Sequence, residues 1–551
     1  MSLAEVVQYL RRWQVEEADR LADQVEQNAW PPSTEILLAL TAATDAMPIS
    51  PALNENRAIV RLLVGNSPDL VERGLQLGNG RLPGVLFFLN ELANRDQVMT
   101  LLESLVVSMR RESLPDPSSG LVAPFLAQAI PSVKVEQAST MRDVLSAMFV
   151  GDCVLLVEGM PVGLRFRSDG TPVRPTEEPN GEPVVRGPKD GFTESAAANL
   201  ALIRRRIRDE RLRVEAFTLG TRSRTHVYML YILDTSLPEL VDEVRSRIQR
   251  IKIDVVLESG YIEEMIEDQT FTLFPQVKPT ERPDVAVSGL LEGKVILITD
   301  GTPHALMAPA TFAAEMQSPE DYYHRWPVSS FFRLLRYVYL LVAFLGPATY
   351  IAITTYHPEL IPTTLLLGLV TAREGVPFPA IVEALVMELT LEALREAGLR
   401  LPKAVGQTIS IVGALVIGEA AVRASLVSPV MVIVVSLTAI SSFIIPLYTM
   451  SLAIRLLRFA MMILAAILGL FGMVIGVVAL LIHLTSLRSF GVPYLSPILP
   501  PTANALKDAA IRVPWWAMRT RPLFMPMRNH RRMGGSNEPK TPRSRGEGEV
   551  N

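Results

Sequence analysis

The uncharged run YVYLLVAFLGPATYIAITTYHP, residues 337–358, decides the fold class of this chain. A helix needs about 20 apolar residues to cross a hydrocarbon core of roughly 30 Å, and this run is long enough. Two further runs without Lys, Arg, Asp or Glu follow at 424–454 and 459–487. Because helices of soluble proteins rarely stay uncharged on every face for so long, the sequence predicts an integral membrane protein.

The parts before residue 327 have the composition of ordinary soluble domains, with alternating strand and helix patterns that predict mixed or parallel sheets covered by helices. We interpret RAIVRLLVG, 57–65, as a strand and CVLLVEG with VGLRFRS, 153–168, as a hairpin. The predicted fold class is multi-domain α/β plus membrane, in which two cytoplasmic α/β domains precede a polytopic α-helical transmembrane domain. The predicted domains are an N-terminal helical extension at 1–45, a first small α/β domain at 46–118, a second α/β domain at 119–327, the polytopic transmembrane domain at 328–488, and a basic, largely disordered cytoplasmic tail at 489–551.

Basic residues predict the orientation in the membrane. Arg325, Arg333 and Arg336 precede the first uncharged run, and the loop YHPELIP after it has no Lys or Arg. The positive-inside rule therefore predicts that the N-terminal domains lie in the cytoplasm, and no signal peptide is expected in the charged N-terminus. The basic tail predicts a cytoplasmic C-terminal end as well, so the number of membrane crossings is expected to be even. The number stays open at four to six, because the run 361–372 is short and bounded by proline. The tail residues concerned are Arg512, Arg519, Arg521, Arg528, Arg531 and Arg532.

No motif in the sequence predicts an enzyme, a cofactor or a metal site. The single cysteine, Cys153, lies in an apolar run and is expected to be a buried structural thiol, and the histidines are scattered without ligand spacing. Asp300 in ITDGTPH is read as a turn residue in preference to a catalytic carboxylate. The arginines of LIRRRI, 202–207, are interpreted as a solvated or interdomain salt-bridge face in preference to an anion or nucleic-acid site.

One helix carries the candidate site. In PAIVEALVMELTLEALREAG, 379–398, Glu388, Glu392 and Glu396 share one helical face, with Glu383 nearby. Carboxylates at membrane depth are costly unless they face water or a partner. The stripe is a candidate pore or vestibule lining, and a ring of such helices would favour cations. The alternative, an interfacial helix with a wet acidic face, stays open.

Two other groups of residues have a predicted structural role in the membrane. Glu419 and Arg423 are spaced i, i+4, as an intramembrane ion pair would be. Gly469, Gly472 and Gly476 provide small residues for close helix packing, either within one subunit or between subunits.

Several motifs resemble one known family. The run RGPKDGFTES with NLALIRRRI, 186–207, is similar to the signature of the GerA family of spore germination proteins, the A subunits of bacterial spore germination receptors. The resemblance continues in the family's order from about residue 141 to 497. The further motifs are ERPD at 281–284, DGTP at 300–303, SPEDYYHRW at 318–326, PATY at 347–350, HPELIP at 357–362, REGVPFP at 373–379, EALREAGLRLPKAVG at 392–406 and FGVPYLSP at 490–497.

The resemblance implies a subunit of a nutrient-sensing receptor in the inner spore membrane, with B and C subunits as partners and homo-oligomerisation around an ion-releasing pore. In that family the nutrient pocket is usually assigned to the B subunit. The resemblance therefore implies a channel or signal-transducing role for this chain. A secondary transporter or permease component that moves a solute is the alternative, and a non-conducting scaffold is a third possibility. No nucleic-acid partner is expected.

Overall fold

The chain folds into two compact units. The α/β unit comprises Met1–Glu267, Val277–Pro309 and Thr520–Met533, and the helical unit comprises Asp268–Gln276, Ala310–Arg519 and Gly534–Asn551. Most of the predicted N-terminal extension, 1–33, lies outside the described residues. The structure, a computed structural model, describes residues 34–77, 82–111, 134–168, 178–179, 181–400, 418–499, 506–521, 527–535 and 537–539.

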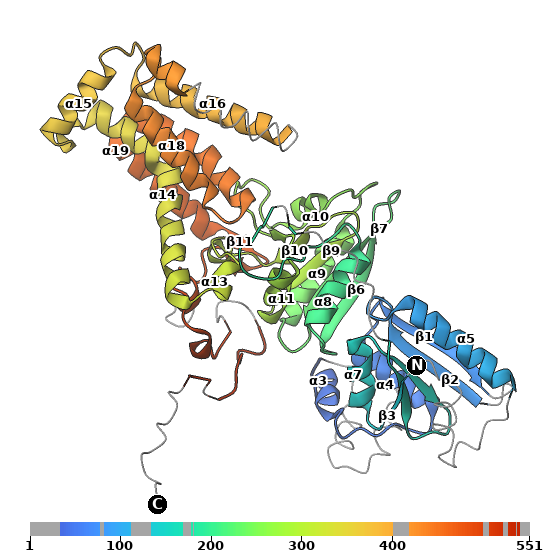
Figure 1. The fold of residues 1–551 in the computed structure, drawn as a ribbon. Helices are drawn as coiled ribbons and strands as arrows, with labels where there is room; N and C mark the ends of the chain where they lie inside the picture. The colour runs from blue at the N-terminus through green and yellow to red at the C-terminus, as the bar shows by residue number, and fades with distance from the viewer. Residues whose placement is uncertain are drawn as a thin grey trace, which may run out of the picture. The chain divides into compact units, whose positions relative to one another are not determined.

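The first layer of the α/β unit is a five-stranded sheet in the order β1-β2-β4-β5-β3 (Figure 1). Successive residues of β2 point to opposite faces, so Phe87 packs with α3, α4 and α7 whereas Phe88 packs with α5. Both faces of the sheet are therefore covered, which explains the nearly continuous apolar sequence of β2 and β4. The elements are α3 (Thr34–Ala43), α4 (Leu53–Val64), β1 (Leu70–Leu77), β2 (Leu82–Leu89), α5 (Arg95–Arg111), β3 (Val135–Ala138), α7 (Met141–Val150), β4 (Cys153–Val157) and β5 (Gly163–Phe166).

A second five-stranded sheet, in the order β6-β7-β9-β10-β8, follows along the chain. Its core lies between the strands and the helices α8 and α11, with Leu200, Leu230 and Leu290 fully buried. The elements are α8 (Ala196–Arg206), β6 (Leu212–Leu219), β7 (Thr225–Ile232), α9 (Pro238–Arg250), α10 (Ser259–Ile266), β8 (Lys278–Thr280), α11 (Pro283–Leu291), β9 (Val295–Thr299) and β10 (Ala305–Ala308).

Three expectations about the α/β unit were wrong. Every strand pair among the described residues is antiparallel, not parallel or mixed, because β4–β5, β6–β7 and β9–β10 are hairpins whose loops are too short for a crossover. The first sheet takes strands from both sides of residue 118, so the predicted boundary between the domains 46–118 and 119–327 falls inside one sheet. RAIVRLLVG belongs to the helix α4, not to a strand. A short apolar run is ambiguous between the two because helices buried on most of their surface lose their polar stripe.

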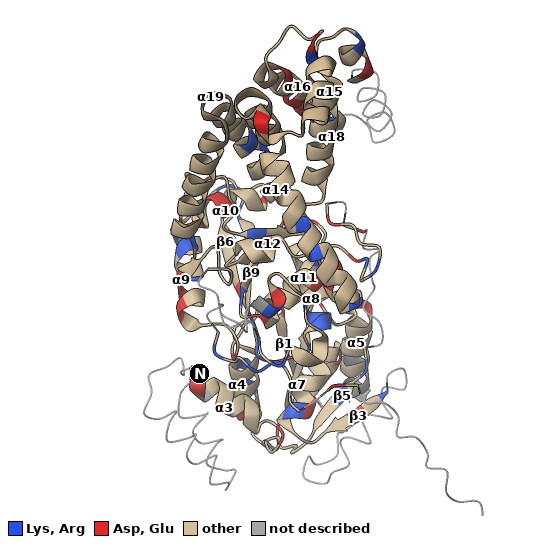
Figure 2. Cartoon of the chain, turned by 90° about the vertical axis from the view of Figure 1, so that its left-hand side faces the viewer, with Lys and Arg blue, Asp and Glu red and all other residues tan. Residues whose placement is uncertain are grey.

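The helical unit begins with two short helices, and its long helices pack on one another (Figure 1). Among the described residues, α14 and α19 are long and apolar enough to cross a membrane, judged by length and composition. The ribbons of α14, α18 and α19 carry few charged residues (Figure 2). The elements are α12 (Phe312–Glu315), α13 (Glu320–Tyr323), α14 (Trp326–Tyr356), η2 (Pro358–Leu360), α15 (Thr363–Arg373), α16 (Ala380–Arg400), α18 (Pro429–Phe443), α19 (Tyr448–Ser486), β11 (Arg488–Ser489), β12 (Val492–Pro493), η3 (Leu506–Asp508) and η4 (Trp515–Ala517).

The single cysteine provides a test of the first sheet. Cys153 on β4 is buried, and burial raises the pKa of its thiol to about 12. At pH 8 the thiolate fraction is then ~10⁻⁴, and the thiolate is the reactive form. We expect a maleimide to label the folded full-length protein very slowly at pH 8 and rapidly after denaturation. A Cys153→Ala, Thr100→Cys variant, with its thiol on the exposed face of α5, is the control that labels at once. Rapid labelling of Cys153 in the folded protein would contradict this arrangement of the sheet.

Candidate functional site

The helix α16 carries the four predicted glutamates. Its N-terminal end contacts α15 and the start of α18 within the helical unit. Pro379 immediately precedes the helix, and its carbonyl accepts the amide N–H groups of Val382 and Glu383. Glu383 lies in the first turn, where a carboxylate interacts favourably with the helix dipole. The structure shows that all four carboxylates have arginine partners, each from the same chain.

Glu383 is buried and binds two neighbouring elements. One carboxylate oxygen lies 3.0 Å from Arg373, the last residue of α15, and the other accepts the Ser428 amide N–H at 2.9 Å. Ser428 is the N-cap of α18, and its hydroxyl accepts the Met431 N–H. Glu383 therefore joins the end of α15, the start of α16 and the start of α18.

Glu388 and Arg458 form a pair in which neither side chain is exposed. An Arg458 Nη1 donates to Glu388 Oε2 at 2.6 Å, and both side chains have 0% exposure. Arg458 lies on α19, 70 residues further along the chain. Removing one partner of such a pair leaves an uncompensated buried charge, which is strongly destabilising.

Glu392 lies one turn further along α16 and has two arginine partners. Arg395 Nη1 donates to it at 2.7 Å, and Arg455 Nε of α19 donates at 3.0 Å. Arg395 also donates to the Ser442 hydroxyl at 3.1 Å, and its guanidinium lies over the Phe443 ring, 5.2 Å from the centroid. Together these groups form what we call the charged cluster. Its members are Glu388, Glu392, Arg395, Arg455 and Arg458.

The remaining predicted charges are exposed. Glu396 pairs with Arg400 at i, i+4, and its side chain is 61% exposed. Glu419 and Arg423 also form an ion pair, and both side chains are mostly exposed. The stripe therefore changes along α16, from buried and paired at Glu383 and Glu388 to exposed at Glu396. Its role as a pore or vestibule lining stays a prediction.

The residues that pair with the stripe were not predicted from the sequence. Arg455 and Arg458 were visible as charges inside an otherwise apolar stretch. Their spacing of three places both on one face of a helix, and Glu388 and Glu392, spaced four apart, also share a face. These spacings indicate that the two arginines could face the two glutamates across a pair of helices. They do not indicate which helix packs against α16.

The three glycines of α19 pack within the subunit. The backbone of Gly469 leaves the helical region, with φ 62° and ψ −143°, so α19 consists of two helices that meet there. Tyr356 Oη donates to the carbonyls of Ala466 and Ile467 just before this break, at 2.8 and 2.9 Å. A Cβ atom at Gly472 or Gly476 would collide with residues that precede the break. These residues are Leu464 and Leu468 for Gly472, and Met461 and Leu464 for Gly476.

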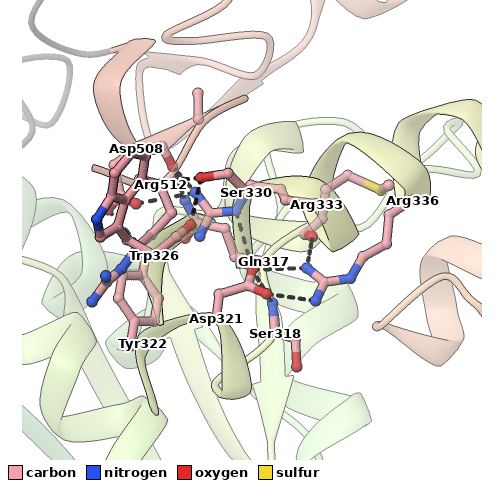
Figure 3. Close-up of polar contacts among 12 residues, drawn as sticks. Gln317, Ser318, Asp321, Tyr322, Trp326, Ser330, Arg333, Arg336, Asp508 and Arg512 are labelled. Carbon is pink, nitrogen blue, oxygen red and sulfur yellow. Dashed lines mark hydrogen bonds and ion pairs between the residues drawn. The ribbon is translucent and has the colours of Figure 1, made fainter. Parts of the chain in front are cut away.

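Ion pairs also surround the start of α14 (Figure 3). Arg333 is fully buried between Asp321, 3.1 Å from its Nε, and Asp508, 3.0 Å from its Nη1. Arg336 binds the second oxygen of Asp321 at 2.6 Å, and Ser330 donates to the Arg512 carbonyl at 2.9 Å. Two of the arginines used to predict the orientation are thus neutralised by carboxylates on α13 and η3. Part of the predicted tail, Leu506–Ala517, contains η3 and η4 and contacts α13 and α14.

In the α/β unit the motifs that resemble the GerA family contact one another. Asp300 Oδ1 accepts the Ala196 N–H at 3.0 Å, at the first residue of α8. Gly301 N–H donates to the Glu194 carbonyl at 2.7 Å, and Phe192 N–H donates to the Glu281 carbonyl at 2.7 Å. The runs around 186–207, 281–284 and 300–303 therefore meet, and the contacts of Asp300 are those of a turn residue that caps a helix.

Two arginines of α8, Arg204 and Arg206, form salt bridges, and one of them joins the two sheets. Arg204 is fully buried and donates to Asp69 at 3.0 Å and to the Ser67 hydroxyl at 2.8 Å, both in the loop before β1. Arg206 pairs with Asp190. From β6, Arg213 Nη1 donates to the Leu63 carbonyl at 2.6 Å at the end of α4. Among the described residues, no group of three or more His, Cys, Asp or Glu side chains could hold a metal ion.

Comparison with known proteins gives one consistent result. The family model described as Bacillus/Clostridium GerA spore germination protein matches residues 58–524. The chain is 44% identical to Uncharacterized membrane protein YfkQ of Bacillus subtilis (strain 168), over 86% of this chain and 91% of that protein. It is 41% identical to Spore germination protein KA of the same organism, over 90% of this chain and 91% of that protein.

A solved structure also matches. The N-terminal domain of the A subunit of the Bacillus megaterium spore germinant receptor GerK3 is 33% identical to this chain and matches with a TM-score of 0.38. The match covers 48% of this chain and 97% of that one.

The buried pair predicts a difference between two substitutions on one helix. We expect Glu388→Gln to destabilise the full-length protein by about 3–5 kcal/mol, because it leaves the Arg458 charge buried without a carboxylate. Glu396→Gln, eight residues further along α16, should cost about 0–1 kcal/mol because its pair is exposed. Thermal unfolding of both variants in detergent or nanodiscs measures the difference. Equal effects of the two substitutions would show that Glu388 is not a buried partner of Arg458.

Proposed function

This chain belongs to the GerA family of spore germination proteins, and from that premise we propose that it is the A-type subunit of a nutrient-responsive germination receptor. One observation carries the proposal: a single family model runs through both the α/β unit and the helical unit, from residue 58 to residue 524. Relatives of similar length are named spore germination proteins. B and C subunits of the same complex are the partners that this assignment implies.

The helical unit would lie in the inner spore membrane, with the α/β unit in the cytoplasm. Large apolar side chains on the outer faces of α18 and α19, such as Ile433, Phe443, Ile467 and Phe471, are exposed in the isolated chain. Such a surface requires lipid or a partner subunit to cover it. The break at Gly469 divides α19 into two apolar helices, which supports a multi-pass arrangement with four to six crossings.

Within this membrane unit, several copies of the chain would together form or gate an ion-release channel. The glutamates of α16 have two different functions. Glu383 and Glu388 hold α16 against α15, α18 and α19, whereas Glu396 and, in part, Glu392 are the carboxylates that can reach water. A carboxylate in contact with water at the mouth of a pore attracts cations.

Ion release by spores tests this assignment. Spores that lack the subunit should release no monovalent cations when nutrient is added, and the wild-type chain should restore release. We expect Glu396→Gln to lower the initial rate of cation release several-fold while the amount of receptor in the membrane is unchanged. Glu374→Gln, at an exposed position before α16, is the matched control and should behave as wild type.

Three results would contradict the proposal. If nutrient-triggered release is the same with and without the subunit, the chain is not part of the receptor that was tested. If the reconstituted complex exchanges a solute with saturable kinetics and carries no nutrient-gated current, the chain belongs to a transporter and not to a channel. A variant with a blocked pore that germinates normally would indicate a scaffold.

A further inference from the structure

The charged cluster contains more positive than negative charge. Its three arginines, Arg395, Arg455 and Arg458, stay protonated under all conditions that proteins experience. Its two carboxylates, Glu388 and Glu392, can neutralise only two of them. The cluster therefore carries a net charge of about +1 even when both glutamates are ionised.

No other carboxylate of the membrane region compensates this charge. Glu383 and Glu396 pair with arginines outside the cluster, as does Glu419. Glu359 lies 3.4 Å from His357, and Glu374 is exposed near the start of α16. The segment 401–417, which the structure does not describe, contains no Asp or Glu. The region 337–487 thus supplies no third acid to the cluster.

The surplus charge lies next to buried donors that have no acceptor. Arg458 is fully buried, and within the described residues its Nε and Nη2 have no hydrogen-bond partner. Glu388 Oε1 has none either, so this buried pair leaves one acceptor and two donor groups unused. Arg395 contacts a hydroxyl and a ring, Ser442 and Phe443, in addition to Glu392. In a medium of low dielectric constant, an unneutralised guanidinium with unpaired N–H groups is costly. A small acceptor with one negative charge would satisfy both the charge and the donors.

We propose that the charged cluster binds a small monovalent anion, such as a halide or a small carboxylate, between α16 and α19. The anion accepts hydrogen bonds from Arg458 and neutralises the surplus charge. This inference rests on the proposed membrane placement of the helical unit, but it does not depend on a channel. It assigns to the acidic helix a site of the opposite sign from the one that its glutamates alone predict.

Anion-dependent stability of the purified full-length protein tests the inference. Sodium gluconate, whose anion is much larger than chloride, is replaced stepwise by sodium chloride at constant ionic strength, and thermal unfolding is followed. We expect Tm to rise by a few degrees and to saturate, because a ligand that binds the folded state raises its stability. Bromide and acetate form parallel arms: a response to bromide alone indicates a halide site, and a response to acetate also indicates a carboxylate site.

Substitutions locate the effect. Arg395→Gln leaves two balanced pairs, Glu388–Arg458 and Glu392–Arg455, and should abolish the chloride-dependent rise in Tm. Ser442→Asp places a carboxylate beside Arg395 and should abolish it as well, which provides a second variant if the first does not fold. Arg400→Gln, in an exposed pair on the same helix, should retain the full response.

An unchanged Tm across the chloride, bromide and acetate series in the wild-type protein would overturn the inference, and so would an equal response in the wild type and Arg395→Gln. Either result leaves the proposed receptor function untouched, because that function is measured by ion release from spores. Conversely, loss of receptor function in spores does not alter the stability measurement on the purified chain.

Discussion

The cost of burying charge among apolar helices is the constraint on which the helical unit depends. Its long helices are mostly uncharged, yet α16 and α19 bring two glutamates and three arginines into contact. Such groups are tolerated at membrane depth only when they are paired, and pairing fixes which helices must be neighbours. Ion pairs therefore help to specify the position of α16 against α19, in addition to the apolar side chains that α16 shares with the core of α14, α18 and α19.

The same principle operates outside the apolar region. Arg333 at the start of α14 is buried between carboxylates from α13 and η3, so the segment after the last long helix is tied to the beginning of the first (Figure 3). In the α/β unit, Arg204 and its partner Asp69 join the two sheets through a fully buried pair. In each case an arginine with several donors contacts segments that are distant in the sequence, which suits a guanidinium better than an ammonium group.

The sequence predicted those features that depend on local patterns. The apolar runs predicted the long helices, and the i, i+4 spacing of Glu388, Glu392 and Glu396 predicted one acidic face on α16. The partners of that face could not be predicted, because Arg458 lies 70 residues from Glu388 and helical periodicity contains no information about which helices are adjacent. Strand order could not be predicted for the same reason: β2 and β4 pair across a long separation in sequence. A positive φ at Gly469 is permitted by the residue type but not required by it.

The central claim is that carboxylates of α16 are neutralised by arginines of α19 in the same chain. The most direct measurement is the thermal stability of a charge exchange, Glu388→Arg with Arg458→Glu, compared with each single substitution in the full-length protein. Our account predicts that each single substitution, which brings like charges together, lowers Tm strongly, and that the double exchange recovers a large part of the loss. A double exchange no more stable than the sum of the single effects would contradict it.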